Sequence, residues 1–149
     1  MGETTPRFRL PQLAVAQAHK EITHNEALAL VDGLLHPVIE GIANSPPQVA
    51  EPDAGKCWLV GTNPDGAFVG HTNSLGYWTG SSWRFATCSD GMRVWHKAES
   101  CFVDYLGQQW SLPPAFTAPT GGTVVDPEAR ALLTALLTRL SDLGLVRTG

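Results

Sequence analysis

The stretch FRLPQLAVAQAHKEITHNEALALVDGLLHPVIEGI, Phe8 to Ile42, decides how the chain begins to fold. Thr23 followed by Glu26 has the pattern of a capping box, in which each side chain bonds the backbone N–H of the other residue. The pattern predicts a helix that begins at His24. Pro37 is expected to end it, because the residue before a proline is pushed out of helical geometry.

Within the predicted helix, apolar residues recur at spacings of three and four. This periodicity is typical of an amphipathic helix with one apolar face, which normally packs against a core. The residues of this stripe are Leu28, Val31, Leu34 and Leu35.

The middle of the chain has the pattern of short strands. A proline-containing linker, Asn44 to Ala54, precedes a region from Lys56 to Leu112 that is rich in aromatic and β-branched residues separated by turn-forming sequences. Such closely spaced strands predict an antiparallel meander, curled into a small barrel or sandwich. The expected strands are Cys57 to Val60, Ala67 to His71, Tyr77 to Trp78, Trp83 to Thr87, Met92 to His96, Cys101 to Tyr105, and Trp110 to Leu112.

A weak aromatic repeat lies inside this region. Trp78-x-Gly80-x-x-Trp83 recurs 27 residues later as Tyr105-x-Gly107-x-x-Trp110. One interpretation is that the aromatic rings form cross-strand pairs within a small sheet, with Trp83 and Trp110 turned to the core. The other is that some rings, Trp78 above all, are open platforms for sugars or a partner. The four candidate contact residues are Trp78, Trp83, Tyr105 and Trp110.

A second helix is predicted near the C-terminus, after a connector rich in proline and glycine, Pro113 to Val125. Asp126 suits the N-cap, Pro127 the first helical position, and Gly144 the residue after the end.

The apolar residues of this second helix follow a 4-3-4-3 spacing. About two heptads are fewer than a secure coiled coil needs. Either the helix packs on a neighbouring subunit, with Leu133, Leu136 and Leu140 as the candidate oligomer interface, or it folds back over its own strands. The apolar residues are Ala129, Leu133, Leu136, Leu140 and Leu143, flanked by Leu132 and Leu137.

Composition and charge limit the classes of function that the sequence supports. The 149 residues are one domain's worth of chain, and the charged fraction of 16% is low. The net charge of −4 and scattered Lys and Arg residues argue against nucleic-acid binding. No apolar run approaches a membrane span or a signal peptide, so synthesis in the cytoplasm is expected.

The cysteines Cys57, Cys88 and Cys101 lack metal-site spacing and are predicted to be reduced and mostly buried.

Motifs for catalysis are absent from the sequence. No phosphate-binding loop, dinucleotide fingerprint, zinc-protease motif, nucleophile elbow or EF-hand loop is found, and the histidines lack ligand spacing. Asp90, Glu99 and Asp104 lie in or near turns, where a glycosidase pair is conceivable but solvated turn residues are equally expected. The sequence therefore predicts a protein that is not an enzyme and holds neither cofactor nor metal.

The order of several short motifs resembles an uncharacterised domain family found in structural proteins of phages, prophages and gene transfer agents, mostly of alphaproteobacteria. The resemblance covers roughly Leu10 to Trp110. It implies a place in a virus-like particle, in a spike or fibre assembly, and no known active site. The motifs are Leu10-Pro11, Gln17, Lys20, His24 to Leu28 and Asp32, then Gly55 to Val60, Gly66 to His71, and Trp78 to Trp83.

Together these observations predict a single α+β domain over residues 1–149, with an N-terminal helical segment (1–43), an aromatic-rich β core (55–112) and a C-terminal helix (126–144). The expected function is a structural component of a phage-like particle, such as the base or adaptor of a spike or fibre for host attachment. Its expected partners are capsid, spike-fibre or tail subunits, further copies of itself, and a surface polysaccharide. A carbohydrate-binding β module and an accessory domain of a cell-wall hydrolase are the alternatives.

Overall fold

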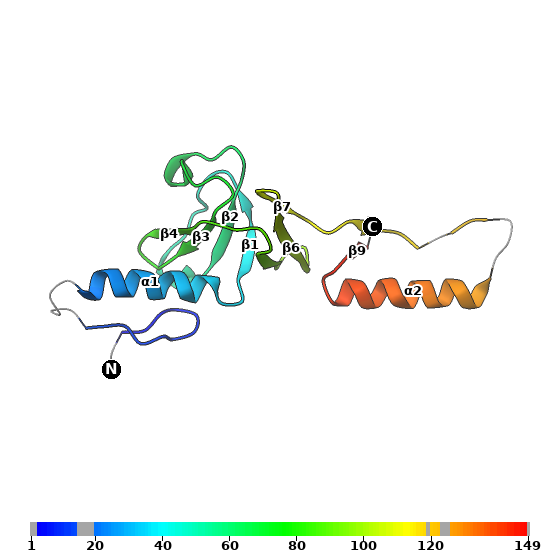
Figure 1. Cartoon of the computed structure of the whole chain (residues 1–149), viewed down its shortest axis with the longest axis horizontal. Helices are drawn as coiled ribbons and strands as arrows, with labels where there is room; N and C mark the ends of the chain where they lie inside the picture. The colour runs from blue at the N-terminus through cyan, green and yellow to red at the C-terminus, as the bar shows by residue number, and fades with distance from the viewer. Residues whose placement is uncertain (1–2, 15–19, 119, 123–125, 149) are drawn as a thin grey trace.

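The computed structural model describes residues 3–14, 20–118, 120–122 and 126–148. Helix α1 (Lys20–Leu34) packs on a mixed β-sheet, and the two make up the sheet domain. The described residues of the range 112–148, called the arm, extend to one side of it as β8 (Ala115–Phe116), α2 (Pro127–Asp142) and β9 (Arg147–Thr148) (Figure 1). The predicted α+β class and its two terminal helices are confirmed.

The sheet has seven strands in the order β4-β3-β2-β1-β5-β6-β7. Its end strands β4 and β7 do not pair with each other, so the predicted barrel is wrong: the sheet is open. Short 3₁₀ helices η1 (Glu51–Asp53) and η2 (Gly66–Phe68) lie in the loops. The strands are β1 (Val38–Ala43), β2 (Cys57–Val60), β3 (Leu75–Trp78), β4 (Trp83–Ala86), β5 (Arg93–His96), β6 (Cys101–Leu106) and β7 (Gln109–Ser111).

The central strand β1 runs parallel to both of its neighbours, which corrects the prediction of a wholly antiparallel sheet. Ile39 is opposite Cys57 of β2, and Val38 is opposite Trp95 of β5. On either side, β2-β3-β4 and β5-β6-β7 are antiparallel meanders. The predicted N-terminal helical segment, 1–43, is therefore not helical to its end, because its last six residues, VIEGIA, form β1.

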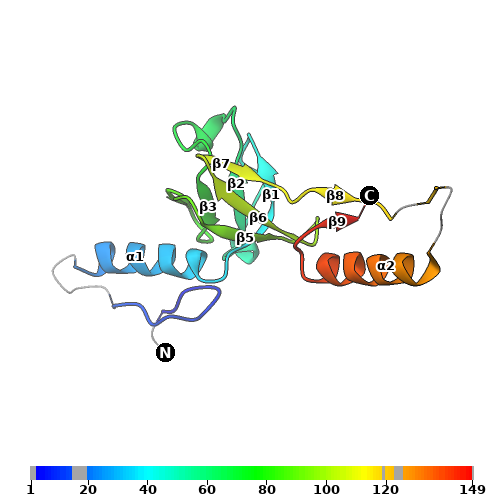
Figure 2. The ribbon, with the colours of Figure 1, turned by 45° about the vertical axis from the view of Figure 1, so that its right-hand side comes forward.

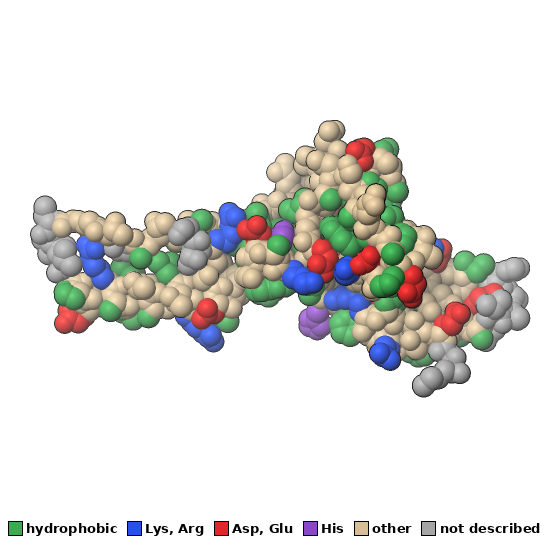
Figure 3. All heavy atoms as spheres, turned by 180° about the vertical axis from the view of Figure 1, so that it is seen from behind, with side chains coloured by type: hydrophobic (Ala, Val, Ile, Leu, Met, Phe, Trp, Pro, Cys, Tyr) green, Lys and Arg blue, Asp and Glu red, His purple; other side chains and the backbone are tan. Residues whose placement is uncertain are grey.

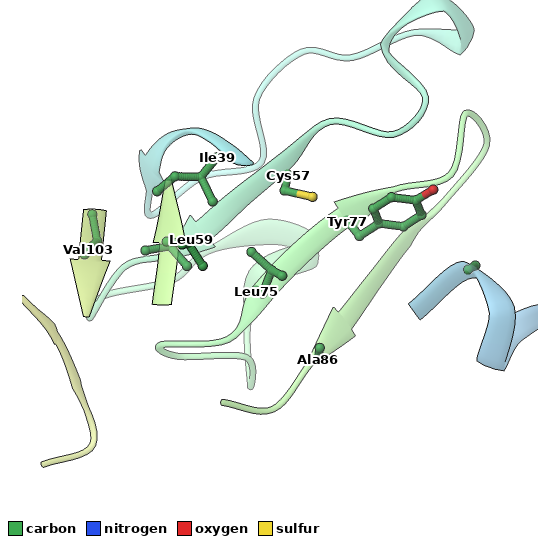
Figure 4. Close-up of a cluster of buried hydrophobic side chains, with 9 residues drawn as sticks. Ile39, Cys57, Leu59, Leu75, Tyr77, Ala86 and Val103 are labelled. Atoms are coloured by element: carbon green, nitrogen blue, oxygen red, sulfur yellow. The ribbon is translucent and has the colours of Figure 1, made fainter. Parts of the chain in front are cut away.

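The core lies on the face of the sheet that α1 covers. Alternate residues of neighbouring strands point into it, as the period of two in a strand requires (Figure 4). Tyr77 lies at its edge next to α1, where its hydroxyl faces a buried carboxylate. The core residues are Ala29, Ile39, Cys57, Leu59, Leu75, Tyr77, Ala86, Val94 and Val103.

Helix α1 docks through its small and polar residues. Ala29, Asp32 and Gly33 are buried, and Gly33 lies so close to the Tyr77 ring that an added Cβ would come within 2.9 Å of Tyr77 Cδ2. The absence of a side chain at this position therefore sets how closely the helix approaches the sheet.

The predicted beginning and orientation of this helix are wrong. Thr23 and Glu26 lie within the helix, so they do not form its capping box, and Glu26 instead pairs with Arg84 of β4 at 3.2 Å. In the predicted apolar stripe Leu28 is half-buried, whereas Val31, Leu34 and Leu35 are exposed and face away from the core.

A buried carboxylate explains this orientation. Asp32 is 0% exposed, and its two oxygens accept four hydrogen bonds of 2.7 to 2.9 Å. The donors are the hydroxyls of Thr5 and Tyr77 and the backbone N–H groups of Arg7 and Phe8. Asp32 thus joins α1, β3 and the N-terminal segment in one polar cluster.

The protonation states agree with this arrangement. Burial by itself raises the pKa of the Asp32 carboxyl, but the hydrogen bonds together outweigh burial and hold the pKa below its ordinary 3.8. Burial, followed by the hydrogen bond to Asp32, raises the pKa of the Tyr77 hydroxyl, which therefore remains a donor.

Arg7 fixes the other end of the helix. Its guanidinium donates to the carbonyl oxygens of Asp32, Gly33 and His36 at 2.7, 3.0 and 2.8 Å. These are carbonyls of the last turn and the residues after it, which lack partners within a helix. The N-terminal segment therefore holds the C-terminal end of α1 as well as its buried carboxylate.

Several local predictions have mixed outcomes. Ala67 to His71 is not a strand, because η2 and a turn occupy that segment, where they seat Phe68 in the interior. All three cysteines are free, and two are buried, as predicted. Gln17 of the resemblance and the end of the connector at Val125 lie outside the described residues.

We expect Asp32→Asn to lower the free energy of unfolding by about 2–4 kcal/mol at pH 7, because an amide group would leave buried donors unpaired. Since the folded pKa is below 3.8, the unfolded state binds the proton first on acidification. The contribution of Asp32 is therefore complete above about pH 4 and lost as pH falls through the folded pKa. Urea titrations at pH 7, 4 and 3 should show a shallower acid dependence in the variant, whereas the exposed Asp142→Asn should retain the wild-type slope.

Gly33→Ala should lower stability by about 1–3 kcal/mol despite the better helix propensity of alanine, because the Tyr77 ring is held by Asp32 and cannot move away. Gly41→Ala is the matched control, since its Cβ would have no neighbour within 4 Å. Thermal melts of both variants measure the difference. Equal midpoints would show that the close approach of helix and sheet is not needed.

Candidate assembly interface

Local sequence signals define both ends of α2. The Asp126 carboxylate accepts a hydrogen bond from the Ala129 N–H at 2.9 Å, and Pro127 occupies the first turn, as predicted. At the other end Gly144 has φ of +68°. The N–H of Leu145 donates to Leu140 O and that of Gly144 to Ser141 O, at 2.9 and 2.8 Å, the pattern of a Schellman cap.

The arm is attached firmly at its base. The Phe102 N–H of β6 donates to Gly144 O at 2.9 Å, and Gly144 lies against the Trp95 ring. Arg147 donates from its backbone to Pro114 O and from its side chain to Pro113 O, each at 3.0 Å. Its guanidinium also pairs with Glu99 at 3.5 Å. The base of α2 is thus tied both to the connector and to the sheet domain.

From this base α2 extends away from α1 and does not fold back over the sheet (Figure 2). None of its residues is buried. Leu132 is 70% exposed, Leu133 48% and Leu136 51%, whereas Leu137 and Leu140 are half-buried. Two residues of the predicted interface, Leu133 and Leu136, are therefore open to solvent, and the third, Leu140, is partly covered.

The apolar residues of α2 form one continuous side of the helix at about 3.6 residues per turn. Thr134 and Thr138 lie on another side, where each hydroxyl donates to the carbonyl four residues earlier, at 2.9 Å. Hydrophobic side chains remain uncovered along the arm (Figure 3). Contiguous apolar surface of this kind is characteristic of an interaction site.

A second uncovered apolar surface lies where α1 ends and β1 begins. A groove of about 460 Å³ is lined by His36, Pro37, Val38, Arg93, Trp95 and Phe102. The Trp95 and Phe102 rings pack edge to face at 4.9 Å, and the Arg93 guanidinium lies over Phe102 at 5.1 Å. The exposed Leu34 and Leu35 immediately precede it in the chain. Sequence reasoning missed this groove, although Trp95 and Phe102 occupy paired positions on adjacent strands.

The four aromatic residues of the repeat form cross-strand pairs. Trp78 is opposite Trp83, and Tyr105 is opposite Trp110, with ring centroids 5.4 and 5.0 Å apart. Tyr105 is buried and the three tryptophans are half-buried. The indole N–H groups of Trp78 and Trp110 donate to Ala50 O and Asn73 O. No ring of the four is a fully exposed platform.

Two further features are a polar pocket beside the arm and a buried thiol. A pocket of about 600 Å³ between the arm and the sheet includes Glu99 and Asp142, but Glu99 is paired with Arg147. Burial raises the pKa of the Cys57 thiol to about 12, which leaves it protonated and unreactive. The part of the chain that the structure describes contains no group of His, Cys, Asp and Glu residues arranged to hold a metal. Nor does any described helix combine the length and hydrophobicity needed to cross a membrane.

Comparison with protein-family models gives one match, over residues 24–111, to the family described as "Protein of unknown function (DUF2793)". The chain belongs to this family, and the expectation of an uncharacterised domain family is confirmed. The matched segment begins within α1 and ends with β7, so the arm lies outside it. No curated protein and no solved structure matches the chain.

Gly144→Ala should detach the arm while leaving the sheet domain folded, because a Cβ would collide with Trp95 and the residue requires a left-handed backbone. Amide exchange should become faster in α2 and at Phe102 but not in β1 to β3. Gly121→Ala is the control, since nothing lies within 4 Å of its added Cβ. Unchanged protection of Phe102 would show that the base of the arm tolerates the side chain.

Proposed function

We propose that this protein is a structural, non-enzymatic subunit of a phage-like particle, and that α2 of the arm joins it to another subunit. The uncovered leucine side of α2 carries the proposal. Burying a leucine side chain is worth about 1.5–3 kcal/mol, so leaving Leu132, Leu133 and Leu136 in water forgoes several such contributions. A partner surface would recover them.

The anchoring of the arm also supports an assembly role. The hydrogen bonds of Gly144 and Arg147 hold α2 in one direction, so little conformational freedom is lost when a partner binds. A flexible tail would lose conformational entropy each time it bound a partner.

The phage-like particle is proposed from the resemblance of the motifs between Leu10 and Trp110. Its implied location is the base or adaptor of a spike or fibre used in host attachment, with capsid, fibre or tail subunits as neighbours. The alternative of a carbohydrate-binding module has less support, since the three tryptophans of the repeat are half-buried in cross-strand pairs. A surface polysaccharide therefore remains a proposed ligand of the particle without an assigned site on this chain.

Particles purified from the producing bacterium test the proposal. Leu132→Glu with Leu136→Glu should lower the amount of this protein in sedimenting particles at least tenfold, because both substitutions place charge on the uncovered apolar side of α2. The matched control, Ala131→Glu with Ala135→Glu, carries the same charge on exposed alanines about 100° around the same helix, outside the leucine side, and should be incorporated normally.

Each contrary result has a specific meaning. Equal incorporation of both double variants would show that α2 is not the joining element. Absence of the wild-type protein from particles, or neighbouring genes for polysaccharide metabolism in place of portal, capsid and tail genes, would contradict the particle function itself.

A further inference from the structure

We propose that α2 of one copy docks onto a defined surface of a second copy, so that subunits join head to tail. This receiving surface consists of Val31 and Leu34 of α1 and the following Leu35, together with the adjoining groove at Val38, Trp95 and Phe102. The inference rests on the proposed function in taking α2 as the joining element, and it names a second copy of this chain as the partner.

The distribution of exposed apolar residues motivates the pairing. Sixteen large hydrophobic residues in the described ranges are exposed, and all but Ile42, Val69 and Leu106 belong to two groups. One group lies on the arm, and the other lies on α1, the N-terminal segment beside it and the start of β1. Each group is an apolar surface without a cover, and the same chain carries both.

One molecule cannot bring these two surfaces together. Figures 1 and 2 show α1 and α2 on opposite sides of the sheet, and the contacts of Gly144 and Arg147 hold the arm in that position. Contact of Leu132, Leu133 and Leu136 with the exposed residues of α1 therefore requires two copies.

The sizes of the surfaces favour this arrangement over pairing of two α2 helices. A stable interface engages about 20–30 residues on each side, whereas one side of the 16-residue α2 offers far fewer. Docking on the receiving surface adds the exposed residues of α1 and of the aromatic groove to the contact. The 15-residue α1 and the 16-residue α2 are about 22 and 24 Å long, so the helices can lie along each other.

The groove has the chemistry that a leucine-rich helix needs. Trp95 and Phe102 form apolar walls, and aromatic anchors of this kind dominate interface energies. An amphipathic helix laid in an apolar groove is a recurrent mode of recognition. Because the two contacting surfaces differ, the contact repeats from copy to copy and gives either a closed ring or an open filament.

Mixing two complementary variants tests the inference by light scattering. The arm variant carries Leu132→Glu and Leu136→Glu, and the receiving variant carries Leu35→Glu and Val38→Glu. Each alone should be monomeric at concentrations where the wild type forms larger assemblies. An equimolar mixture should give only 1:1 dimers, because it contains one intact arm and one intact receiving surface per pair.

Ile42→Glu with Val69→Glu is the matched control, since these residues are exposed apolar residues outside both groups, and its assembly should equal that of the wild type. Circular dichroism of each variant verifies the fold. As a second readout, Leu136→Cys and Val38→Cys placed on different copies should form an intermolecular disulfide when a thiol oxidant such as diamide is added.

Three outcomes would overturn the inference: self-association of the receiving variant as in the wild type, a mixture that stays monomeric, or a wild type that is monomeric throughout. The first would indicate pairing of α2 with α2. If the wild type is monomeric and the arm variant is still lost from particles, α2 joins this chain to a different partner. That result would overturn the inference and leave the proposed function in place, so failure of the one is distinguishable from failure of the other.

Discussion

The buried carboxylate of Asp32 is the constraint on which the arrangement of the sheet domain depends. A charged group at 0% exposure is tolerated only when donors surround it, and here they come from α1's neighbours in space: the N-terminal segment and Tyr77 of β3. Because these donors have fixed positions, α1 can dock in one rotation only. That rotation brings Ala29 and Gly33 to the core and leaves Val31, Leu34 and Leu35 in solvent.

This orientation of α1 leaves apolar side chains in water, which lowers the stability of the single molecule, and hydrophobic periodicity does not predict it. The stripe at three- and four-residue spacing in α1 is real, but the polar cluster around Asp32 and the close approach of Gly33 to Tyr77 outweigh its burial within one molecule. The face of α1 that carries Asp32 is buried against the sheet, so its apolar face can be buried only when a second surface covers it. The inward face thus specifies the fold, and the outward face is available for assembly.

The sequence predicted best what depends on neighbouring residues. Asp126, Pro127 and Gly144 define the ends of α2 through contacts within a single turn, and the aromatic pairs follow from the hairpin turns between them. Contacts between distant segments were not predictable in this way. The parallel pairing of β1, the inward side of α1 and the groove at Trp95 all require knowledge of which segments meet.

Trp95 connects the two proposed surfaces through packing. Its ring is a wall of the groove, and Gly144 at the base of the arm lies directly against the same ring. The arm, which lies outside the matched family segment, is therefore attached to the sheet domain at one wall of the receiving surface. A side chain on Gly144 would displace the Trp95 ring. The attachment of the arm and the shape of the groove therefore both depend on the position of this one indole. Under the proposed docking, the attachment of the arm in one copy and the binding of the next copy would therefore be coupled through Trp95.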